Sequence, residues 1–439
     1  MVLSRFLKDR RGGVAPMFAL AIIPVFGLVG AAVDYSRANS VRTGMQSAID
    51  ATALAMAKVA PTLTPAQLQQ QTTAYFNAMF NHPEAKNLVI TPTYTTAGGS
   101  QLVISVSGSV DTSFMRIMGF SSLNIGSTST VKWGNNRLRV ALVLDNTGSM
   151  ADDNKMSALK TATNALLTQL KNAATQNGDV YVSIIPFVKD INVDNSNRHA
   201  TWIDWTDFDA NNGTCSNYNG WHTPTDQASC QNASGTWKKA KHSTWNGCVT
   251  DRGNSGAPSS GNYDTNVTAP GASTDTMFSA EQYDSCPQAI KPLSYDWTGM
   301  TTLVNNMSPA GNTNQAIGLA HGWMSLVGGG PYPAPPAMDP NYQYSQVIIL
   351  LTDGLNTEDR WYTSQNSIDA RQQMTCNNVK AAGITLYTVQ VNTGGDPTST
   401  LLQNCASTSD KFFLVTTSSG IGTIFNQIGT NLSKLRIAR

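Results

Sequence analysis

The chain has 439 residues, room for about two or three domains, and hydrophobic residues make up 41% of it. Charged residues make up only 13%, and 29 Lys and Arg nearly balance 28 Asp and Glu, which argues against a nucleic-acid binder driven by bulk charge and against a disordered chain. The six cysteines are too few for a disulfide scaffold and form no CxxC pair, so a few disulfides are favoured over a zinc ribbon.

An uncharged run near the N-terminus predicts a membrane span. Residues 12–33 hold no charged side chain, and as a helix they would be roughly 33 Å long, enough to cross a bilayer core of about 30 Å. Residues 1–11 carry four basic residues and one acidic residue, so the positive-inside rule places them in the cytoplasm and the chain after Val33 outside it. We expect a retained transmembrane helix, with a cleaved signal peptide ending near Gly30-Ala31-Ala32 as the alternative.

The helix is expected to continue beyond this run. From Tyr35 to Val59 the sequence has one Gly and no Pro, and Pro61 should end the helix. A mildly apolar stripe recurs at spacings of three and four, at Val41, Met45, Ile49, Thr52 and Met56. Such a stripe suits pilin-like assembly or packing on the chain's own next domain, and the sequence leaves both interpretations open.

Residues 62–134 have the pattern of a small α+β module. Thr64 and Pro65 suit the N-cap and the first position of a helix running to about Phe80. Runs at 88–94, 102–106 and 123–127 predict strands, and 114–119 predicts a short helix ended by Gly119.

From residue 136 onward, apolar strand-like runs alternate with helical patterns. The expected strands are 138–144, 180–185, 347–351, 384–389 and 412–415. This alternation is typical of a parallel sheet covered by helices. We therefore predict an α/β, Rossmann-like domain over residues 136–439, preceded by the transmembrane helix at 12–33 and a helix with a small α+β module at 34–135.

Oxygen-bearing side chains follow the expected strands. Asp145 comes directly after the first strand and Asp353 after a later one, and Thr313 lies in a polar loop that begins a helix. In open α/β sheets, ligands bind beyond the carboxyl ends of the strands. Thr147 and Ser149 alternate with Asp145, so one tight loop could direct three side chains to one point. Carboxylate and hydroxyl oxygens are the ligands that a hard divalent cation such as Mg²⁺ prefers.

At these residues the sequence resembles the von Willebrand factor type A family and its metal-ion-dependent adhesion site. The family's Asp-x-Ser-x-Ser motif reads Asp145-x-Thr147-x-Ser149 here, while Thr313 matches the family's lone Thr and Asp353 its distal Asp. The resemblance covers residues 138–435. It implies that Ser149, Thr313 and Thr147 bind a divalent cation directly, and that Asp145 and Asp353 bind it directly or through water. Mg²⁺ is the expected ion, with Mn²⁺ and Ca²⁺ as alternatives.

Other site classes lack their motifs. The sequence has no GxxxxGK[ST] phosphate loop, no HExxH zinc motif and no GxSxG elbow. The first strand of the α/β domain leads into Asp-Asn-Thr-Gly and not into a glycine-rich dinucleotide turn. We therefore expect no enzyme activity.

Residues 190–295 are an insertion that the sheet does not need. It holds four of the six cysteines and five of the nine tryptophans, which favours a folded lobe held by disulfides. Among the connectivities that six cysteines allow, we expect the pairs Cys215–Cys230, Cys248–Cys286 and Cys376–Cys405. The insertion could recognise a partner above the metal or only stabilise the sheet edge, and the sequence leaves both open.

The whole chain resembles the TadG-like proteins of bacterial Flp (tight-adherence) pilus assembly, many of which end in a von Willebrand factor type A domain. The resemblance lies in the basic start and uncharged run, in residues 30–38 and 46–55, and in the stretches 245–248 and 286–287. Phe18 stands where a prepilin cleavage site would carry Glu, so a permanent anchor is favoured over cleavage by a prepilin peptidase.

This resemblance implies a single-pass protein of the bacterial inner membrane with its bulk in the periplasm. The expected partner is a pilus-assembly protein whose acidic side chain completes the coordination of the metal, and no nucleic acid is expected. The alternative is an envelope-spanning scaffold in which the metal only stabilises loops. A hydrolase that uses the cation as a Lewis acid is disfavoured, because the sequence offers no nucleophile–base pair near Asp145.

Overall fold

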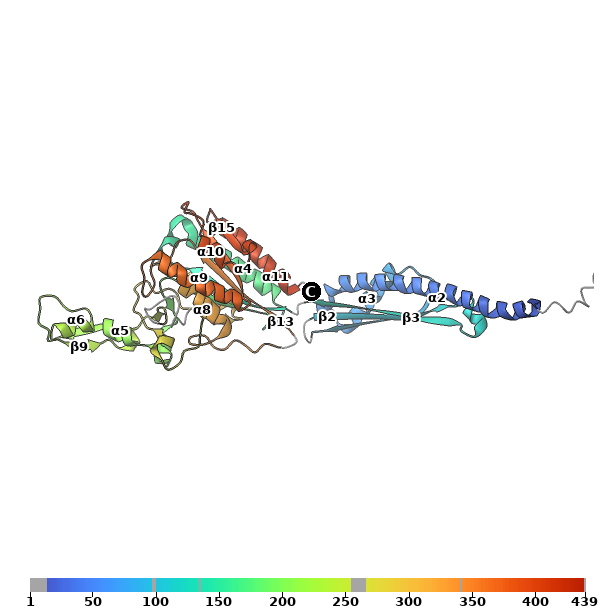
Figure 1. Ribbon diagram of the computed structural model, residues 1–439, viewed down its shortest axis with the longest axis horizontal. Coiled ribbons are helices and arrows are strands. Elements are labelled where there is room, and N and C mark those ends of the chain that lie inside the picture. The colour runs from blue at the N-terminus through green and yellow to red at the C-terminus, as the bar shows by residue number, and fades with distance from the viewer. Residues whose placement is uncertain (1–13, 97–99, 134–135, 254–265, 340–341, 438–439) are drawn as a thin grey trace, which may run out of the picture. The chain divides into compact units, whose positions relative to one another are not determined.

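The computed structural model describes residues 14–96, 100–133, 136–253, 266–339 and 342–437. They form two compact units, one within residues 1–135 and one within 136–438 (Figure 1). The predicted cytoplasmic start, residues 1–11, lies outside the described residues.

The first unit is a long helix against a small antiparallel sheet. Helix α2 (Val14–Ala57) is followed by the 3₁₀ turn η1 (Ala60–Thr62) and helix α3 (Pro65–Met79). Thr64 caps α3 through a reciprocal pair of hydrogen bonds with Gln67, as its position before Pro65 predicts. The sheet has the order β1-β2-β3, with strands β1 (Ala85–Thr95), β2 (Ser100–Asp111) and β3 (Ser122–Trp133).

The apolar stripe of α2 packs on this sheet. Val41, Met45, Ile49 and Thr52 are fully buried and Met56 nearly so. They share a core with residues of α3 and the sheet, among them Phe76, Leu102, Ile104 and Val106. Of the two interpretations left open by the sequence, packing on the chain's own next module is therefore the one that the structure supports, because no apolar stripe of these residues is left for another chain.

Large apolar side chains in the N-terminal half of α2 are exposed and not buried. They include Phe18, Leu20, Phe26 and Leu28. Within the described residues, α2 is the helix that is long and apolar enough to cross a membrane, over a candidate range of Leu20–Ala57. This apolar helix is consistent with a single-pass membrane anchor.

The second unit is built on a six-stranded sheet of order β12-β5-β4-β13-β14-β15. Its strands are β4 (Asn136–Asp145), β5 (Val180–Phe187), β12 (Lys291–Ser294), β13 (Gln343–Thr352), β14 (Thr385–Val391) and β15 (Phe412–Val415). The five predicted strands are parallel, but β12, which the sequence analysis did not predict, pairs antiparallel with β5 at one edge. The sheet is therefore mixed and not wholly parallel.

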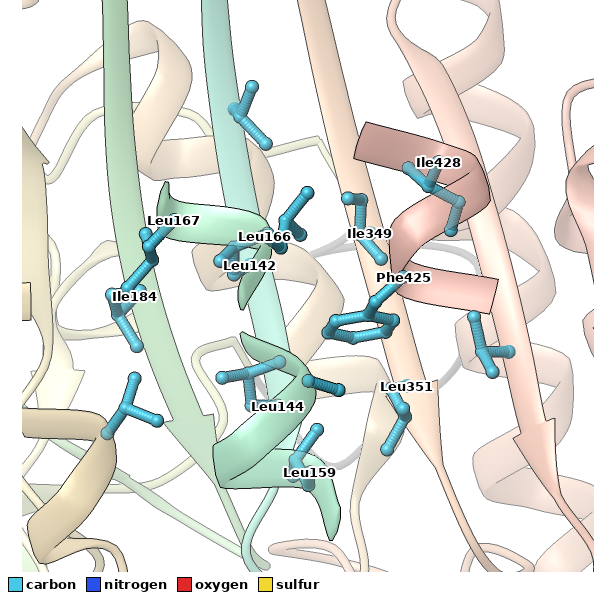
Figure 2. Packing of buried hydrophobic residues seen from close by; sticks show 14 of the residues in the cluster. Leu142, Leu144, Leu159, Leu166, Leu167, Ile184, Ile349, Leu351, Phe425 and Ile428 are labelled. Carbon is cyan, nitrogen blue, oxygen red and sulfur yellow. The ribbon is translucent and has the colours of Figure 1, made fainter. Parts of the chain in front are cut away.

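Helices cover both faces of this sheet. They are α4 (Lys155–Ala173), α7 (Trp297–Asn306), α8 (Gln315–Val327), α9 (Gln365–Ala381), α10 (Thr400–Cys405) and α11 (Gly420–Ile437). Side chains of β4 alternate between the faces, as the pleat requires. Leu142 and Leu144 pack with Leu159 of α4 and Phe425 of α11 (Figure 2), and Val143 belongs to the opposite cluster with α8 and α9.

The insertion consists of short elements at the β5 side of the domain. Its strand pairs are β6 (Ile191–Asn192) with β10 (Cys248–Val249), β7 (Ile203–Asp204) with β11 (Phe278–Ser279), and β8 (Gly213–Ser216) with β9 (Thr236–Lys239). Two short helices, α5 (Thr206–Asn211) and α6 (Gln227–Asn232), accompany them. All three predicted disulfides are confirmed: Cys215–Cys230, Cys248–Cys286 and Cys376–Cys405.

The buried stripe of α2 gives a first prediction. Met45→Ala should destabilise the first unit by about 2–5 kcal/mol, because it leaves a cavity between α2 and the sheet. Faster hydrogen exchange of the β2 amides in the full chain would report this loss. The matched control is Leu54→Ala on the same helix, where the side chain is 64% exposed and the expected change is within about 0.5 kcal/mol. Equal exchange in the two variants would contradict the packing role of Met45.

Candidate functional site

Two carboxylates lie at the carboxyl ends of neighbouring strands. Asp145 is the last residue of β4, and Asp353 directly follows β13. These strands are parallel neighbours in which Leu144 lies opposite Leu351. The sheet register therefore brings the two acids, far apart in sequence, to the same edge. Asp145 is fully buried and Asp353 is 7% exposed.

Both oxygens of Asp145 are held by hydroxyl and amide donors. Its Oδ1 accepts hydrogen bonds from the backbone N–H of Thr147 at 2.8 Å and from the Thr147 hydroxyl at 2.5 Å. Its Oδ2 accepts one from the Thr352 hydroxyl at 2.7 Å and one from the Asp353 N–H at 3.4 Å. The carboxylate thus fixes the loop that follows its own strand and the end of the adjacent strand.

A chain of polar contacts continues to Asp353. The Thr147 hydroxyl lies 3.2 Å from that of Ser149, which donates to Asp353 Oδ1 at 2.7 Å. Four of the five predicted ligands, Asp145, Thr147, Ser149 and Asp353, are therefore in one continuous contact network. The loop after Thr147 turns into the 3₁₀ segment η3 (Gly148–Asn154), which leads into α4.

Thr313 belongs to a third loop that is bonded to the first. The Gly148 N–H donates to the carbonyl of Gly311 at 2.9 Å, and the Ala310 N–H donates to that of Asn146, also at 2.9 Å. Gly311 has φ +79°, a conformation that favours glycine, and a Cβ there would lie 2.7 Å from the Tyr283 hydroxyl. The Asn146 side chain also donates to the Ser308 carbonyl at 2.6 Å. The Thr313 N–H is held by the Thr357 hydroxyl at 2.8 Å, so the loop of Thr313 is bonded both to the first loop and to the loop after β13.

A lysine that the sequence analysis did not single out balances part of the charge. The Lys155 ammonium lies 2.6 Å from Asp353 Oδ2, and both side chains are buried. Burial and then the negative charge of Asp353 raise the pKa of Asp145 to about 7, although the hydrogen bonds from Thr147 and Thr352 work against this rise. When both carboxylates are ionised, the positive charge of Lys155 balances one of them. The three groups together then carry one negative charge.

The donor set fits a hard divalent cation. Within the described residues there is no cluster of three or more His, Cys, Asp or Glu with a metal-binding arrangement, and this site instead combines two carboxylates with hydroxyls. Such all-oxygen sets suit Mg²⁺, Mn²⁺ and Ca²⁺ better than softer metals. Asp145, Thr147, Ser149, Thr313 and Asp353 are the residues that would hold the ion.

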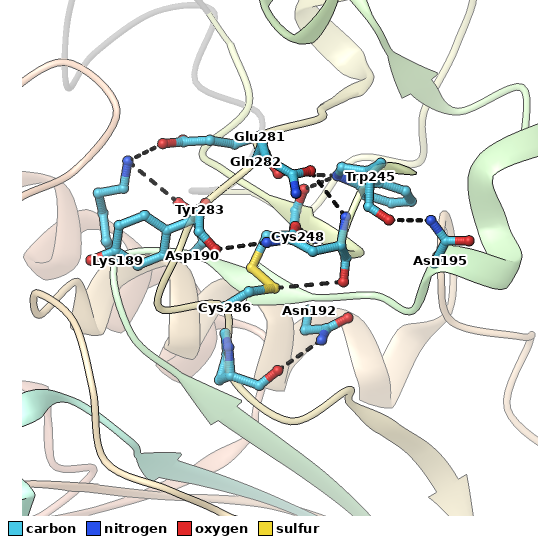
Figure 3. The surroundings of a disulfide bond; sticks show 12 residues. Lys189, Asp190, Asn192, Asn195, Trp245, Cys248, Glu281, Gln282, Tyr283 and Cys286 are labelled. Carbon is cyan, nitrogen blue, oxygen red and sulfur yellow. Dashed lines mark hydrogen bonds and ion pairs between the residues drawn. A yellow bond between two sulfur atoms is a disulfide. The ribbon is translucent and has the colours of Figure 1, made fainter. Parts of the chain in front are cut away.

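The base of the insertion lies against the third loop. Tyr283 accepts a hydrogen bond from the Asn312 N–H at 3.0 Å, and Asn314 donates to Asp251 at 2.9 Å. Lys189 pairs with Glu281 of the insertion near the Cys248–Cys286 disulfide (Figure 3). These residues brace the site, and the sequence signals that pointed to this region were its cysteines, its tryptophans and the family-like stretches 245–248 and 286–287.

A buried acid lies beside this brace. Asp190 is fully buried next to Lys189 (Figure 3). Burial, followed by the negative charge of Glu281, raises the pKa of Asp190 well above its usual range, and Lys189 opposes that rise. Asp190 was not singled out by the sequence analysis, because it belongs to no recognised motif and its charged partner Glu281 is distant in sequence.

Comparison with protein families assigns both parts of the chain. Residues 12–58 match the family described as "Putative Flp pilus-assembly TadE/G-like", and residues 273–427 match the von Willebrand factor type A (VWA) domain. The chain carries a TadE/G-like segment followed by a VWA domain. The VWA match begins after Asp145, Thr147 and Ser149, but the strand that ends at Asp145 lies in the same sheet as β13, β14 and β15. The α/β fold and the family resemblance predicted from the sequence are both confirmed.

Solved structures give distant matches to this chain. The pilus adhesin SpaC from Lactobacillus rhamnosus GG is 13% identical with a TM-score of 0.38, covering 82% of this chain and 36% of SpaC. The vWF domain of the type V pili tip protein Mfa5 from Porphyromonas gingivalis is 10% identical with a TM-score of 0.38, covering 69% of this chain and 97% of that domain.

A third match is proximal thread matrix protein 1 from the mussel byssus, with a zinc-occupied MIDAS motif, at 12% identity and a TM-score of 0.34. It covers 69% of this chain and 47% of that protein. The chain spans about a third of the length of SpaC, 36%. At these TM-scores the likenesses carry no argument about how this VWA domain works. A search of curated protein sequences found no match.

The buried pair of Lys155 and Asp353 gives a second prediction. In the full chain, without added cation, Lys155→Met should lower the free energy of unfolding of the VWA domain by about 3–5 kcal/mol, because it leaves a buried carboxylate unpaired. Urea unfolding followed by tryptophan fluorescence measures the change. Lys171→Met is the matched control, since Lys171 lies on the same helix and is exposed. Similar stability of the two variants would show that Lys155 does not balance the acids.

Proposed function

We propose that this protein is a membrane-anchored, non-enzymatic binding protein of a Flp pilus-assembly apparatus, and that its VWA domain holds a divalent cation. The ligands are Asp145, Thr147, Ser149, Thr313 and Asp353, and the ion is Mg²⁺. The observation that supports this proposal most directly is the contact network in which Ser149 joins Asp353 at 2.7 Å and Thr147 joins Asp145 at 2.5 Å. Two buried acids and two hydroxyls lie together at the sheet edge where α/β domains bind ligands.

The charge balance favours an acidic partner. Lys155 and the two carboxylates leave one negative charge, so a divalent cation reverses the sign of the site to one positive charge. A carboxylate of the partner would complete the coordination of the ion and neutralise that charge. Binding would then depend on the cation and would not need a highly charged surface, in keeping with the net charge of +1 of the chain.

A cavity is lined by the insertion and by the loop that follows β13, and its residue Glu358 donates its N–H to the Thr313 carbonyl at 3.3 Å. Its lining includes Lys189, Asp207, Glu281 and Arg360. These charges pair with one another, as Lys189 does with Glu281 and as Arg360 does with Asp207 at 2.6 Å. The lining also includes Glu358 and Asp359, so acids outnumber cations there. The bound cation would therefore supply the positive charge that a partner's carboxylate needs.

The membrane part of the proposal rests on the N-terminus. The TadE/G-like match covers residues 12–58, and the exposed apolar side chains of α2 begin within it. We propose that residues 12–33 cross the inner membrane, with residues 1–11 in the cytoplasm and the rest in the periplasm. The disulfides of the VWA domain suit an oxidising compartment of this kind.

A scaffold is the second candidate, and one observation favours it. The first and third loops are joined by the Gly148–Gly311 and Ala310–Asn146 hydrogen bonds, so an ion bound by both loops would strengthen an existing connection between them. In that case the cation only stabilises the loops and the chain links membrane and envelope. A hydrolase is not proposed, because the Ser149 hydroxyl and the Asp353 carboxylate that it contacts are both assigned to the cation, and Lys155 holds the other oxygen of that carboxylate.

Calorimetry tests the metal site. Titration of Mg²⁺ or Mn²⁺ into the full chain in detergent should show binding that Asp145→Asn weakens at least about tenfold, a loss of about 1.4 kcal/mol, because a charged ligand becomes neutral at nearly constant shape. Asp152→Asn is the matched control, since Asp152 is an exposed acid of the same loop. Absence of binding, or equal affinity in the two variants, would remove the metal site from the proposal.

Thermal unfolding combined with partner capture separates the two candidates. An adhesion-type site predicts that EDTA, or Asp145→Asn, abolishes capture of envelope proteins from detergent extracts of the native cell by the immobilised full chain. Added Mg²⁺ should restore capture by the unaltered chain after EDTA treatment but should not restore capture by Asp145→Asn. A scaffold predicts that EDTA lowers the melting temperature of the VWA domain while the captured proteins stay the same. The second result would rule out the partner contact at the metal.

A further inference from the structure

The connection between β2 and β3 carries an unusual set of exposed apolar side chains. It includes the 3₁₀ turn η2 (Met115–Met118), which ends at Gly119 in the left-handed conformation, as the sequence predicted. The exposed side chains are Phe114 (49%), Ile117 (86%), Met118 (50%) and Phe120 (59%). Exposing four large apolar side chains of one loop to water is unfavourable in free energy. Such a grouping marks a surface that contacts an apolar partner or medium. We call residues 112–121 the apolar loop.

This loop lies along α2 at a defined level of the helix. A Cβ at Gly30 would lie 2.4 Å from Phe114, and a Cβ at Gly27 would lie 3.1 Å from Met118. The two glycines therefore allow the loop to approach the helix closely. Gly27 is seven residues before Asp34, which corresponds to about 10 Å along a helix.

Asp34 fixes the loop to the helix. Its buried carboxylate accepts hydrogen bonds from three consecutive backbone N–H groups, those of Ser113 at 2.9 Å, Phe114 at 2.8 Å and Met115 at 2.7 Å. Hydrogen bonds from three backbone N–H groups to one carboxylate are charge-assisted and directional, so they hold the loop firmly in place. Asp34 is therefore a positioning residue that holds the apolar loop at the level of Gly27 and Gly30.

The backbone of the loop is largely satisfied without water. In addition to the three N–H groups bound by Asp34, the N–H groups of Ile117, Gly119 and Phe120 donate to carbonyls within the loop. The Thr112 N–H donates to the Ser121 carbonyl and closes its base. A loop can enter an apolar medium only if its backbone polar groups are hydrogen-bonded internally. Each unpaired backbone group would cost roughly 2–7 kcal/mol of free energy on transfer from water to that medium.

The apolar surface of the loop is continuous with that of the helix. Phe26, Leu28 and Val29 of α2 are 67%, 74% and 58% exposed at the same level. If residues 12–33 cross the membrane, as proposed above, a loop that reaches Gly27 lies below the end of the span at Val33. The exposed Arg116 adds a cation suited to lipid phosphates beside the apolar side chains.

We propose that the apolar loop inserts its Ile117, Met118 and Phe120 side chains into the outward-facing leaflet of the bilayer, next to α2. This inference rests on the proposed membrane anchor and adds a second membrane contact to it. The occupant is lipid, because the loop shares its level with the exposed apolar residues of the span. Insertion at two points fixes the tilt and rotation of the first unit relative to the membrane, which a single flexible span would leave free.

Site-directed fluorescence tests this proposal in the full chain. Among the described residues all cysteines are in disulfides, so Ile117→Cys supplies a thiol for an NBD probe in vesicles of phosphatidylethanolamine and phosphatidylglycerol. The probe should emit at shorter wavelength, and doxyl lipids should quench it several-fold more than a probe at Thr95→Cys, an exposed position at the far end of β1. A probe at Phe26→Cys reports the anchor itself.

The outcomes separate the loop from the anchor. Unquenched probes at both Phe26 and Ile117 would overturn the membrane anchor and the loop proposal together. Quenching at Phe26 with Ile117 no different from Thr95 would overturn the loop proposal alone. A blue-shifted Ile117 probe that lipid quenchers do not affect would mean that a protein, such as a second copy, covers the loop, and would also overturn it.

A positioning variant provides an independent check. Asp34→Ala should release the loop, so quenching at Ile117 should fall toward the Thr95 value while quenching at Phe26 stays unchanged. The matched control is Asp50→Ala, an exposed acid of the same helix whose contact is with Gln46. Undiminished quenching at Ile117 in Asp34→Ala would show that Asp34 does not position the loop.

Discussion

The buried carboxylate of Asp145 is the constraint on which the functional edge of the VWA domain depends. One of its oxygens fixes the loop that follows β4 through Thr147, and the other fixes the end of β13 through Thr352. Removal of this one group would leave buried hydroxyl and amide donors unpaired in two loops, and such donors are expensive to bury. The orientation of Ser149 toward Asp353, and with it the proposed ion site, follows from this anchoring.

The rest of the domain supports that edge in layers. The parallel register of β4 with β13 sets the level of the two acids, and the two apolar clusters on either side of the sheet hold the strands. The base of the insertion then braces the third loop through Tyr283 and Asp251. The insertion is therefore more than a rim on the sheet edge. Its lobe is joined to the rest of the domain by short strand pairs, by the Asp207–Arg360 ion pair and by Phe208 and Trp245 in the apolar cluster.

Much of this arrangement could be predicted from local sequence patterns. The parallel strands and the helix over residues 35–59 leave a clear mark in periodicity, and the five candidate ligands follow family motifs. The three disulfide pairings were chosen among the connectivities that six cysteines allow, because cysteine spacing alone does not determine them. The antiparallel β12 was missed because Lys291–Ser294 is short and carries no alternation. Lys155 and Asp34 were missed for another reason: their roles depend on partners that are distant in sequence, and a lone charged residue in a helical pattern looks like a solvated one.

The insertion also has a consequence for how the domain is made. Asp145 and Asp353 meet although 208 positions separate them, while the two disulfides inside the insertion close over separations of 15 and 38 residues. Local bridges and the short lobe can therefore form while β13 is still missing, whereas the edge that carries both acids is assembled only when β13 adds to β4. A chain truncated before β13 would hold the disulfide-bonded lobe with only one of the two acids, so the proposed metal site depends on synthesis of the chain through Asp353.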